Sequence, residues 1–214
     1  MSAAQIVVIA KEPVAGRVKT RLTPPFTPAQ AAHLASAALR DTLHAVAATR
    51  VHRRVLALEG LPGTWLPDGF TVIPQRGDGL DQRLAAAFHD AHRLYRLPVV
   101  LIGMDTPQVT PDLLDTAVTL LATHDAVYGP ASDGGFWLLG LRHPDPSLLL
   151  GVAMSRPTTG TTQLRRLRET GLDVARMPEL DDVDTAADAF RVAARAPGSR
   201  FAEALAAVGA GVSR

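Results

Sequence analysis

The sequence contains no cysteine, and this absence excludes disulfides, thiolate metal sites and thiol nucleophiles together. No apolar run is long enough to cross a bilayer, and residues 1–5 lack the basic start and apolar stretch of a signal peptide. Aromatic residues make up 5% of the chain and the formal net charge is +1, so few groups can stack on bases and there is no general attraction to anionic surfaces. We therefore expect a soluble cytoplasmic protein that binds neither nucleic acid nor membrane. The oligomeric state stays open.

Lysine is also scarce, because only Lys11 and Lys19 among the 22 basic residues are lysine. Both lie in residues 5–22, QIVVIAKEPVAGRVKTRL, which begin with the short apolar run 6–10. The length and β-branched content of this run favour a buried strand. A lysine ammonium is a compact, strongly hydrated point charge, unlike an arginine guanidinium, so the placement of both lysines here favours a specific role for ammonium groups in this loop.

The loop after this strand has a high density of positive charge. Four cations follow the strand in a turn that contains Gly16, and Glu12 is the one acidic residue among them. Such cations repel one another unless an anion neutralises them, and a polyphosphate is a common anion of suitable size. The predicted nucleotide-binding residues of this loop are Lys11, Gly16, Arg17, Lys19 and Arg21. A solvated basic turn is the alternative.

Short apolar runs alternate with amphipathic stretches along the whole chain. Strands are expected at residues 6–10, 55–58, 70–73, 99–102, 126–128, 136–141 and 173–176. Helices are expected at residues 28–48, 80–94, 111–124, 161–170, 185–194 and 200–207. This alternation predicts one α/β domain, residues 1–214, whose mostly parallel sheet is covered on both faces and binds its ligand at the carboxyl ends of the strands.

Two acidic motifs suggest a metal site. The motif Gly-Met-Asp-Thr-Pro directly follows the predicted strand 99–102, and its Asp105 can hold Mg²⁺ (or Mn²⁺) by its oxygens, although it can also cap the next turn. Asp182 and Asp184 lie in Glu-Leu-Asp-Asp-Val-Asp-Thr and share one side if the segment is extended, while Asp181 points away. A divalent cation would relieve the repulsion in this segment. Asp184 or Thr185 can alternatively cap the following helix.

Two glycine-containing motifs are further candidates. Asp133, Gly134 and Gly135, in Ser-Asp-Gly-Gly-Phe-Trp, allow a ligand to approach the backbone closely and are our acceptor-binding candidates; a hairpin or loop is the alternative. A polar patch before the helix at 80–94 is suited to a base or ribose, or is a plain loop; its candidates are Gln75, Gly79 and Arg83. Neither a P-loop nor a GxGxxG fingerprint occurs.

The order of these motifs resembles a known family. K-x-P-x-x-G-x-V-K-T-R-L, G-x-D-T-P, D-G-G-[FY]-x-L-x-G-L and D-V-D-T-x-x-D resemble the DUF2064 family of the nucleotide-diphospho-sugar transferase superfamily, also described as rSAM/selenodomain-associated transferases. The first loop and its helix are also similar to the 2-phospho-lactate guanylyltransferases. The resemblance implies a glycosyltransferase A type Rossmann-like α/β/α sandwich with one reversed strand. It also implies a nucleotide in the amino-terminal half and a second substrate in the carboxyl-terminal half.

The resemblance also implies roles for individual residues. Lys11, Lys19 and Arg21 match phosphate-loop positions, Asp105 matches the metal-binding aspartate, and Asp182 or Asp184 matches a late carboxylate. One departure is Met154-Ser155-Arg156, where many members have tryptophan before a Ser-Thr pair, so the acceptor stays open.

These patterns predict a Mg²⁺-dependent transferase that binds a nucleoside triphosphate or a nucleotide-sugar, together with a small-molecule acceptor. Nucleotidyl transfer to a small phosphorylated acceptor comes first, because four cations on one loop suit a leaving pyrophosphate. Lys19 and Asp105 are then the expected catalytic residues. Glycosyl transfer from a nucleotide-sugar is the alternative, and an inactive nucleotide-sensing module is the third hypothesis.

Overall fold

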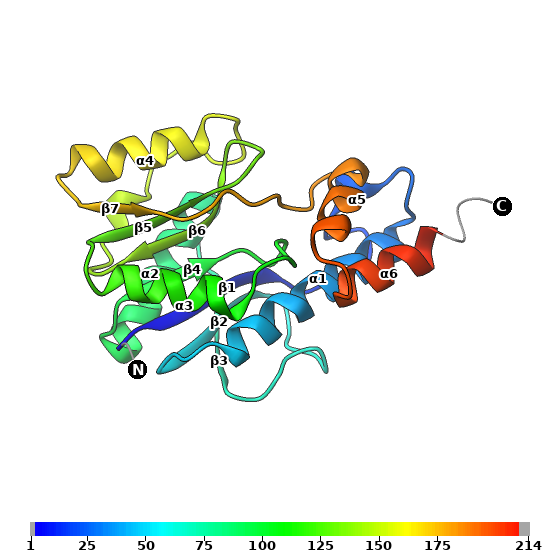
Figure 1. Cartoon of the computed structure of the whole chain (residues 1–214), viewed down its shortest axis with the longest axis horizontal. Helices are drawn as coiled ribbons and strands as arrows, with labels where there is room; N and C mark the ends of the chain where they lie inside the picture. The colour runs from blue at the N-terminus through cyan, green and yellow to red at the C-terminus, as the bar shows by residue number, and fades with distance from the viewer. Residues whose placement is uncertain (1–2, 210–214) are drawn as a thin grey trace.

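The computed structural model describes residues 3–209, in which seven strands form one sheet with helices packed on it (Figure 1). The strands are β1 Gln5–Lys11, β2 Arg53–Glu59, β3 Phe70–Pro74, β4 Val99–Ile102, β5 Ala126–Pro130, β6 Phe136–Leu141 and β7 Val174–Arg176. The helices are α1 Pro28–Ala48, α2 Leu80–Tyr95, α3 Pro111–Leu121, α4 Thr159–Glu169, α5 Ala186–Arg195 and α6 Arg200–Gly209. Two 3₁₀ turns, η1 Thr20–Leu22 and η2 Pro146–Leu148, are too short for any hydrophobic period to predict.

The sheet is mostly parallel, as predicted, and its strand order is β3-β2-β1-β4-β6-β5-β7. β6 is the reversed strand, since it pairs antiparallel with both β4 and β5. The connection from β5 to β6 has only five residues, 131–135, which allows a hairpin but is too short for a parallel crossover. The α/β fold with one reversed strand is therefore confirmed.

Alternate side chains of the central strands point into two apolar layers. Ile6 and Val8 of β1 belong to the layer covered by α1 and α3, whereas Val7 belongs to the layer covered by α2 and α4. Helices on both faces make the expected α/β/α sandwich. Within residues 3–209, no helix combines the length and the apolar character that a membrane span requires.

Local capping chemistry sets the boundaries of several helices. Thr27 and Gln30 form a reciprocal capping box at the start of α1, with the Thr27 N–H donating to the Gln30 Oε1 at 2.8 Å. Thr110 accepts from the Leu113 N–H at 3.3 Å, so α3 begins where predicted. α3 ends at Leu121, three residues before the predicted end, and residues 122–123 form a turn.

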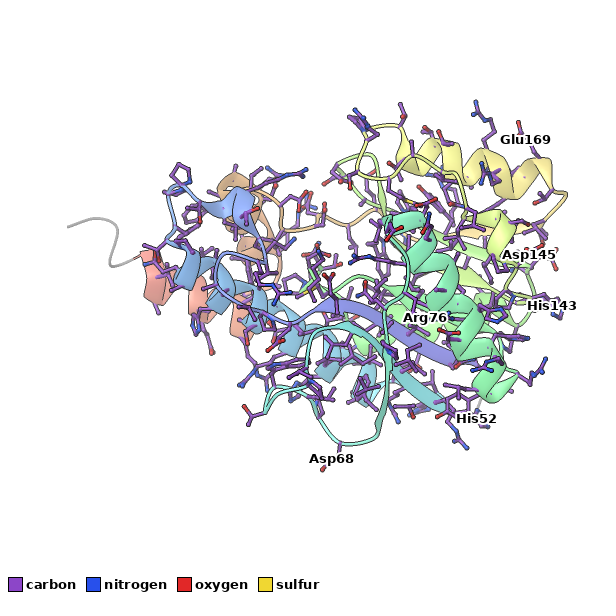
Figure 2. The ribbon with its side chains drawn as sticks, turned by 180° about the vertical axis from the view of Figure 1, so that it is seen from behind. His52, Asp68, Arg76, His143, Asp145 and Glu169 are labelled. Atoms are coloured by element: carbon purple, nitrogen blue, oxygen red, sulfur yellow. The ribbon has the colours of Figure 1, made fainter. Side chains whose placement is uncertain are left out.

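A third apolar cluster lies to one side of the sheet, where α5 and α6 pack on the amino-terminal half of α1 (Figure 1). Figure 2 shows the same arrangement from behind. We call this group of helices, together with η1, the helical lobe. Its buried members include Leu22 of η1 and Val183, which precedes α5. The lobe therefore anchors both the loop that carries Lys19 and the acidic segment around residue 183.

Candidate active site

A cleft of about 880 Å³ opens at the carboxyl ends of β1 and β4, where a ligand is expected in an open α/β sheet. Most of the predicted site residues line it: Lys11, Arg17, Lys19, Arg21, Gln75, Arg83, Asp105, Asp133, Gly135, Asp182 and Asp184. Three predicted residues, Gly16, Gly79 and Gly134, do not line it. The folded chain thus brings together motifs that are up to 173 positions apart, from Lys11 to Asp184.

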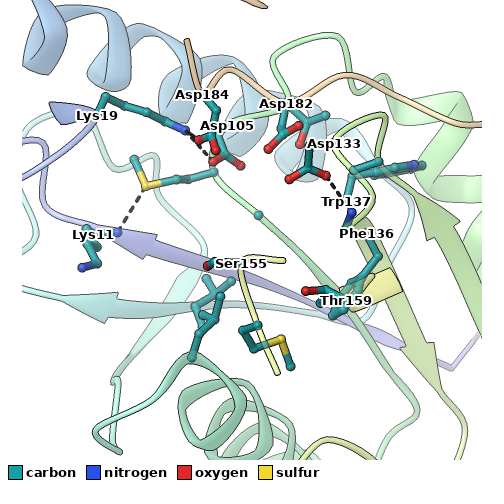
Figure 3. A pocket seen from close by; sticks show the side chains of 18 of the residues that line it. Lys11, Lys19, Asp105, Asp133, Phe136, Trp137, Ser155, Thr159, Asp182 and Asp184 are labelled. Carbon is teal, nitrogen blue, oxygen red and sulfur yellow. Dashed lines mark hydrogen bonds and ion pairs between the residues drawn. The ribbon is translucent and has the colours of Figure 1, made fainter. Parts of the chain in front are cut away.

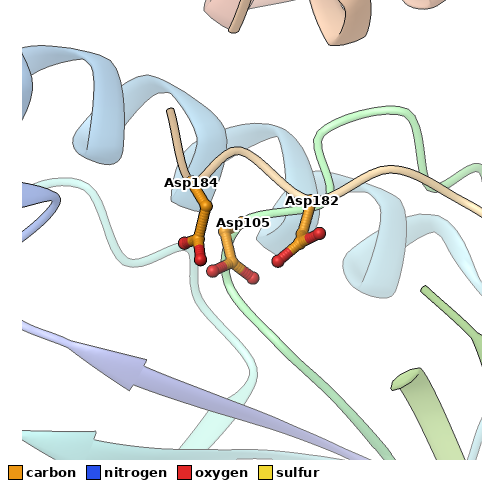
Figure 4. A group of neighbouring side chains, drawn as sticks. All are labelled: Asp105, Asp182 and Asp184. Atoms are coloured by element: carbon orange, nitrogen blue, oxygen red, sulfur yellow. The ribbon is translucent and has the colours of Figure 1, made fainter. Parts of the chain in front are cut away.

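Three carboxylates form a cluster in this cleft. Asp105, Asp182 and Asp184 each offer one oxygen, and these atoms all lie within 4.8 Å of one another. Figure 4 shows the three carboxyl groups side by side. Asp105 lies on the loop after β4, while the other two belong to residues 180–184, which we call the acidic strap. The same three residues were predicted as metal ligands.

The strap holds its two carboxylates on one side because Val183 between them is buried in the helical lobe. The Val183 N–H donates to the carbonyl of Asp105 at 3.0 Å, and the Leu180 N–H donates to that of Pro130 at 3.2 Å. These bonds tie the strap to the loop after β4 and to the end of β5.

The three carboxylates of the cluster carry more negative charge than the cations beside them neutralise. Burial, and then repulsion by Asp105, Asp133 and Asp184, raise the pKa of Asp182 to about 7. Asp182 forms no ion pair with any residue in the range 3–209. A half-buried set of three carboxylates with this charge excess has the donor chemistry that a hard divalent cation prefers.

Lys19 reaches directly into the carboxylate cluster (Figure 3). Its Nζ lies 2.7 Å from the Asp105 Oδ2 and 3.3 Å from the Asp184 Oδ1, and only 9% of the side chain is exposed. Burial would lower the pKa of Lys19, but attraction to Asp105 and Asp184 outweighs it and raises the pKa. Arg21 adds a second cation at 2.9 Å from Asp184.

Other carboxylates also neutralise the basic loop. The Lys11 Nζ lies 3.2 Å from the Glu59 Oε2, whereas Arg17 is exposed and forms no ion pair within the described part of the chain. Glu12 is the one acidic residue among these cations in the sequence, but in the folded chain Glu59, Asp105 and Asp184 pair with three of them. Glu59 and the acidic cluster come from distant segments, which the local sequence could not reveal.

Glu59 is an ion-pair partner of two cleft-lining residues that sequence reasoning missed. It is the last residue of β2, one position beyond the predicted strand, and it pairs with both Lys11 and Arg83. Burial would raise the pKa of Glu59, but hydrogen bonds from Lys11 and Arg83 lower it. The available signal was its position at the carboxyl end of a parallel strand.

The predicted base or ribose patch is partly occupied by contacts within the protein. The Gln75 Nε2 donates to the carbonyls of Ala10 at 2.7 Å and Ala57 at 3.1 Å. Arg83, besides its pair with Glu59, donates to the Gly77 carbonyl at 3.0 Å. Gln75 and Arg83 therefore brace the cleft wall, while Gly79 precedes α2 as its N-cap.

The Asp133–Gly135 turn packs against the start of α4. The Asp133 Oδ1 accepts from the Gly135 N–H at 2.7 Å, and Gly134 has a φ of +88°. A Cβ at Gly134 would overlap the carbonyl oxygen of Pro157, and the Gly160 N–H donates to the Gly134 carbonyl at 2.7 Å. Glycine at position 134 thus allows close packing within the chain, while Asp133 itself lines the cleft (Figure 3).

Similarity to known proteins agrees with this architecture. The sequence model of the family described as "Uncharacterized protein conserved in bacteria (DUF2064)" matches residues 33–156. A 3-phospho-D-glycerate guanylyltransferase from Phenylobacterium zucineum is 34% identical over 201 residues, which are 87% of this chain and 89% of that protein. A 2-phospho-L-lactate guanylyltransferase from Natrialba magadii is 31% identical over 140 residues, which are 59% of this chain and 58% of that protein.

A solved structure extends the likeness to the whole fold. A Desulfovibrio desulfuricans G20 protein, provisionally named a nucleotide-diphospho-sugar transferase, superposes with a TM-score of 0.89 at 26% identity. The match covers 100% of this chain and 98% of that one. The present chain belongs to the DUF2064 family and has the fold of the nucleotide-diphospho-sugar transferases.

Proposed function

We propose that this protein is a nucleotidyltransferase that uses a divalent cation and transfers the guanylyl (GMP) group of GTP to a small phosphorylated acceptor. The observation that carries the proposal is the cleft in which Lys19 and Arg21 face three clustered carboxylates. The choice of GTP rests on the two relatives, both of which are named guanylyltransferases.

Asp105, Asp182 and Asp184 would hold the cation, Mg²⁺ or Mn²⁺. Their oxygens are close enough for one ion, and the raised pKa of Asp182 indicates negative charge that Lys19 and Arg21 do not fully offset. Such a cation, when bound, would orient the phosphates of the nucleotide and reduce their negative charge.

The basic loop would bind the triphosphate. Lys19 is the best placed cation, because its ammonium already lies among the carboxylates and can contact a phosphate oxygen there. Arg21, Lys11 and Arg17, the last of which forms no ion pair within the described residues, would hold the pyrophosphate end of the nucleotide. Gln75 and Arg83 remain our candidates for the base and ribose, with Gly16 and Gly79 acting through the turns that they form.

The reaction would need no nucleophile from the protein. An oxygen of the acceptor phosphate forms a bond to the α-phosphorus of GTP, the bond from that phosphorus to the bridging oxygen breaks, and pyrophosphate leaves. The side chains would contribute by positioning both substrates and by stabilising the charge that develops on the leaving group.

The acceptor would occupy the part of the cleft away from Lys19, where Figure 3 shows Phe136, Ser155 and Thr159. Asp133 and Gly135 also line the cleft, whereas Gly134 does not and would act only through the turn that it forms. Arg156 also lines the cleft and forms no ion pair within residues 3–209. The acceptors named for the two relatives are phosphorylated carboxylic acids, and Arg156 is our candidate for pairing with such a carboxylate.

Pyrophosphate release tests the proposal. The full chain would be incubated with each of the four NTPs and with 3-phospho-D-glycerate or 2-phospho-L-lactate, in Mg²⁺, Mn²⁺ or EDTA. We expect acceptor-dependent pyrophosphate with GTP and a divalent cation, a new diphosphate signal in ³¹P NMR, and strong loss of both in Asp105→Asn. Absence of pyrophosphate under every condition would contradict nucleotidyl transfer to acceptors of this kind.

Glycosyl transfer is the second candidate, because the Desulfovibrio desulfuricans protein is provisionally named a nucleotide-diphospho-sugar transferase. It would use the same cleft to hold the diphosphate of a nucleotide-sugar. Consumption of a GDP- or UDP-sugar with release of the nucleoside diphosphate, and no pyrophosphate from any NTP, would favour it over our proposal.

A further inference from the structure

Asp181 is a buried carboxylate next to the proposed metal ligands but turned away from the cleft. Only 3% of the residue is exposed. Its Oδ1 accepts from the Ser132 hydroxyl at 2.6 Å, and its Oδ2 forms an ion pair with Arg195 at the end of α5. Its carbonyl accepts from the Gln108 Nε2 at 2.6 Å. One residue of the acidic strap therefore contacts three other segments of the chain.

These contacts connect parts of the fold that carry the site. Ser132 precedes Asp133 in the turn after β5, and Gln108 follows Asp105 on the loop after β4. Arg195 belongs to the helical lobe, which also buries Val183. Along the strap, buried residues therefore alternate with cleft-lining ones. Asp181 and Val183 are buried and hold the strap in place, whereas Asp182 and Asp184 face the cleft.

The strap needs such anchors because its carboxylates repel Asp105. Oxygens of Asp182 and Asp184 lie within 4.8 Å of an oxygen of Asp105, and like charges at this separation push the segments apart. Lys19 pairs with Asp105 and Asp184 but not with Asp182. A flexible strap would move away and leave a poorer set of cation ligands.

We propose that Arg195 and Ser132, acting through the buried carboxylate of Asp181, hold Asp182 and Asp184 at the positions needed to bind a divalent cation. They are positioning residues, since neither would touch the cation or the substrates. The inference rests on the metal site of the proposed function. Partners that orient metal ligands commonly change metal affinity by 10–100-fold when they are removed.

Arg195 could act by positioning the strap or only through its charge. The direction in which its removal changes the cation affinity distinguishes the two. If Arg195 acted only as a nearby positive charge, its removal would make the cluster more negative and tighten cation binding. If Arg195 acts by positioning, its removal leaves the Asp181 carboxylate buried without the guanidinium that pairs with it. The strap then shifts so that water can reach this carboxylate. Cation binding is then weakened.

The experiment measures Mn²⁺ binding to the full-length protein by the loss of the free Mn²⁺ signal in electron paramagnetic resonance. We expect Arg195→Gln to raise the Kd for Mn²⁺ about tenfold. Ser132→Ala should also raise the Kd for Mn²⁺, although this substitution changes no charge. Arg195→Lys should keep most of the wild-type affinity. The matched control is Arg200→Gln, which removes an arginine of the same lobe that pairs at 3.3 Å with Asp41 of α1 and not with a residue of the strap.

Thermal unfolding of each variant shows that binding is measured on folded protein. A Kd for Arg195→Gln equal to or below that of the wild type would overturn the positioning role, and so would an equal loss in Arg200→Gln. If Arg195→Gln does not fold, an unchanged Kd in Ser132→Ala overturns the proposal just as clearly. A wild type that binds no Mn²⁺ would overturn the metal site itself, which is a distinguishable result.

Discussion

Replacing Asp182 by asparagine should stabilise the cation-free protein and weaken its binding of a divalent cation. The carboxylate is partly buried beside Asp105, Asp133 and Asp184, and its pKa is raised to about 7 from an ordinary value of 3.8. Its ionised form is therefore disfavoured in the folded state. Asparagine has nearly the same shape but no charge, so it removes this repulsion along with one cation ligand.

The size of the effect follows from the two pKa values. Their difference corresponds to an upper limit of about 4 kcal/mol, at 1.36 kcal/mol for each tenfold change in proton affinity. Asp182 keeps some contact with solvent, which screens the repulsion, so we expect about 1–2 kcal/mol. For a chain of this length that corresponds to an increase in Tm of roughly 2–8 °C.

The stabilisation should depend on pH in a defined direction. Below pH 3.8 both the folded and the unfolded wild type hold the proton, and the variant gains nothing. Between pH 3.8 and about 7 the unfolded state loses the proton first, so the wild type becomes progressively less stable than the variant. Above pH 7 the difference reaches its full value.

Thermal unfolding at pH 5 and pH 8, with EDTA or Mn²⁺, measures these quantities. The control is Asp68→Asn, an equal chemical change on the exposed loop between β2 and β3 (Figure 2), which should change the Tm little at either pH. Mn²⁺ should raise the Tm of the wild type much more than that of Asp182→Asn. The reasoning is refuted if Asp182→Asn is no more stable than the wild type in EDTA at pH 8.

Three other predictions concern the same region. Lys19→Ala should lower the stability of the cation-free protein by about 1–2 kcal/mol, because Asp105 and Asp184 lose their shared cation; Mn²⁺ should restore the Tm but not GTP turnover. Gly134→Ala should destabilise the protein by roughly 2 kcal/mol or more in urea unfolding, because its φ of +88° and the Pro157 carbonyl both disfavour a side chain. The affinity of the wild type for Mn²⁺ should rise by up to about tenfold per pH unit until pH 7 and then level off, since a proton on Asp182 competes with the ion.

Each of these has an outcome that would contradict it. An unchanged Tm for Lys19→Ala in EDTA would mean that the ion pairs contribute nothing to stability. The control for Gly134→Ala is Gly171→Ala, because Gly171 has a φ of +80° but open space around it. If Gly134→Ala is as stable as the wild type, the packing against Pro157 is unimportant. A Mn²⁺ affinity that does not vary between pH 5.5 and 7 would argue against Asp182 as a ligand.

The sequence alone determined which segments form strands and α-helices, because their signals are local. The apolar runs 99–102 and 136–141 coincide with β4 and β6, and the helix from 28 to 48 coincides with α1. A capping box and a hydrophobic period each lie within a few residues of the element that they define. The carboxylates proposed as ligands were also found this way, since Asp105 follows a buried strand and Asp182 and Asp184 lie in a short run of acidic residues. That residues 1–214 form one domain stays a prediction.

The tertiary structure decided what these elements face. Lys19 pairs with carboxylates 86 and 165 positions away, and a pairing of that kind depends on the path of the whole chain. The same holds for the direction of β6, for the contact of Gly134 with Pro157 and for the anchors of Asp181. A residue's type limits which partner it can accept, but only the folded backbone brings one particular partner within a few ångströms.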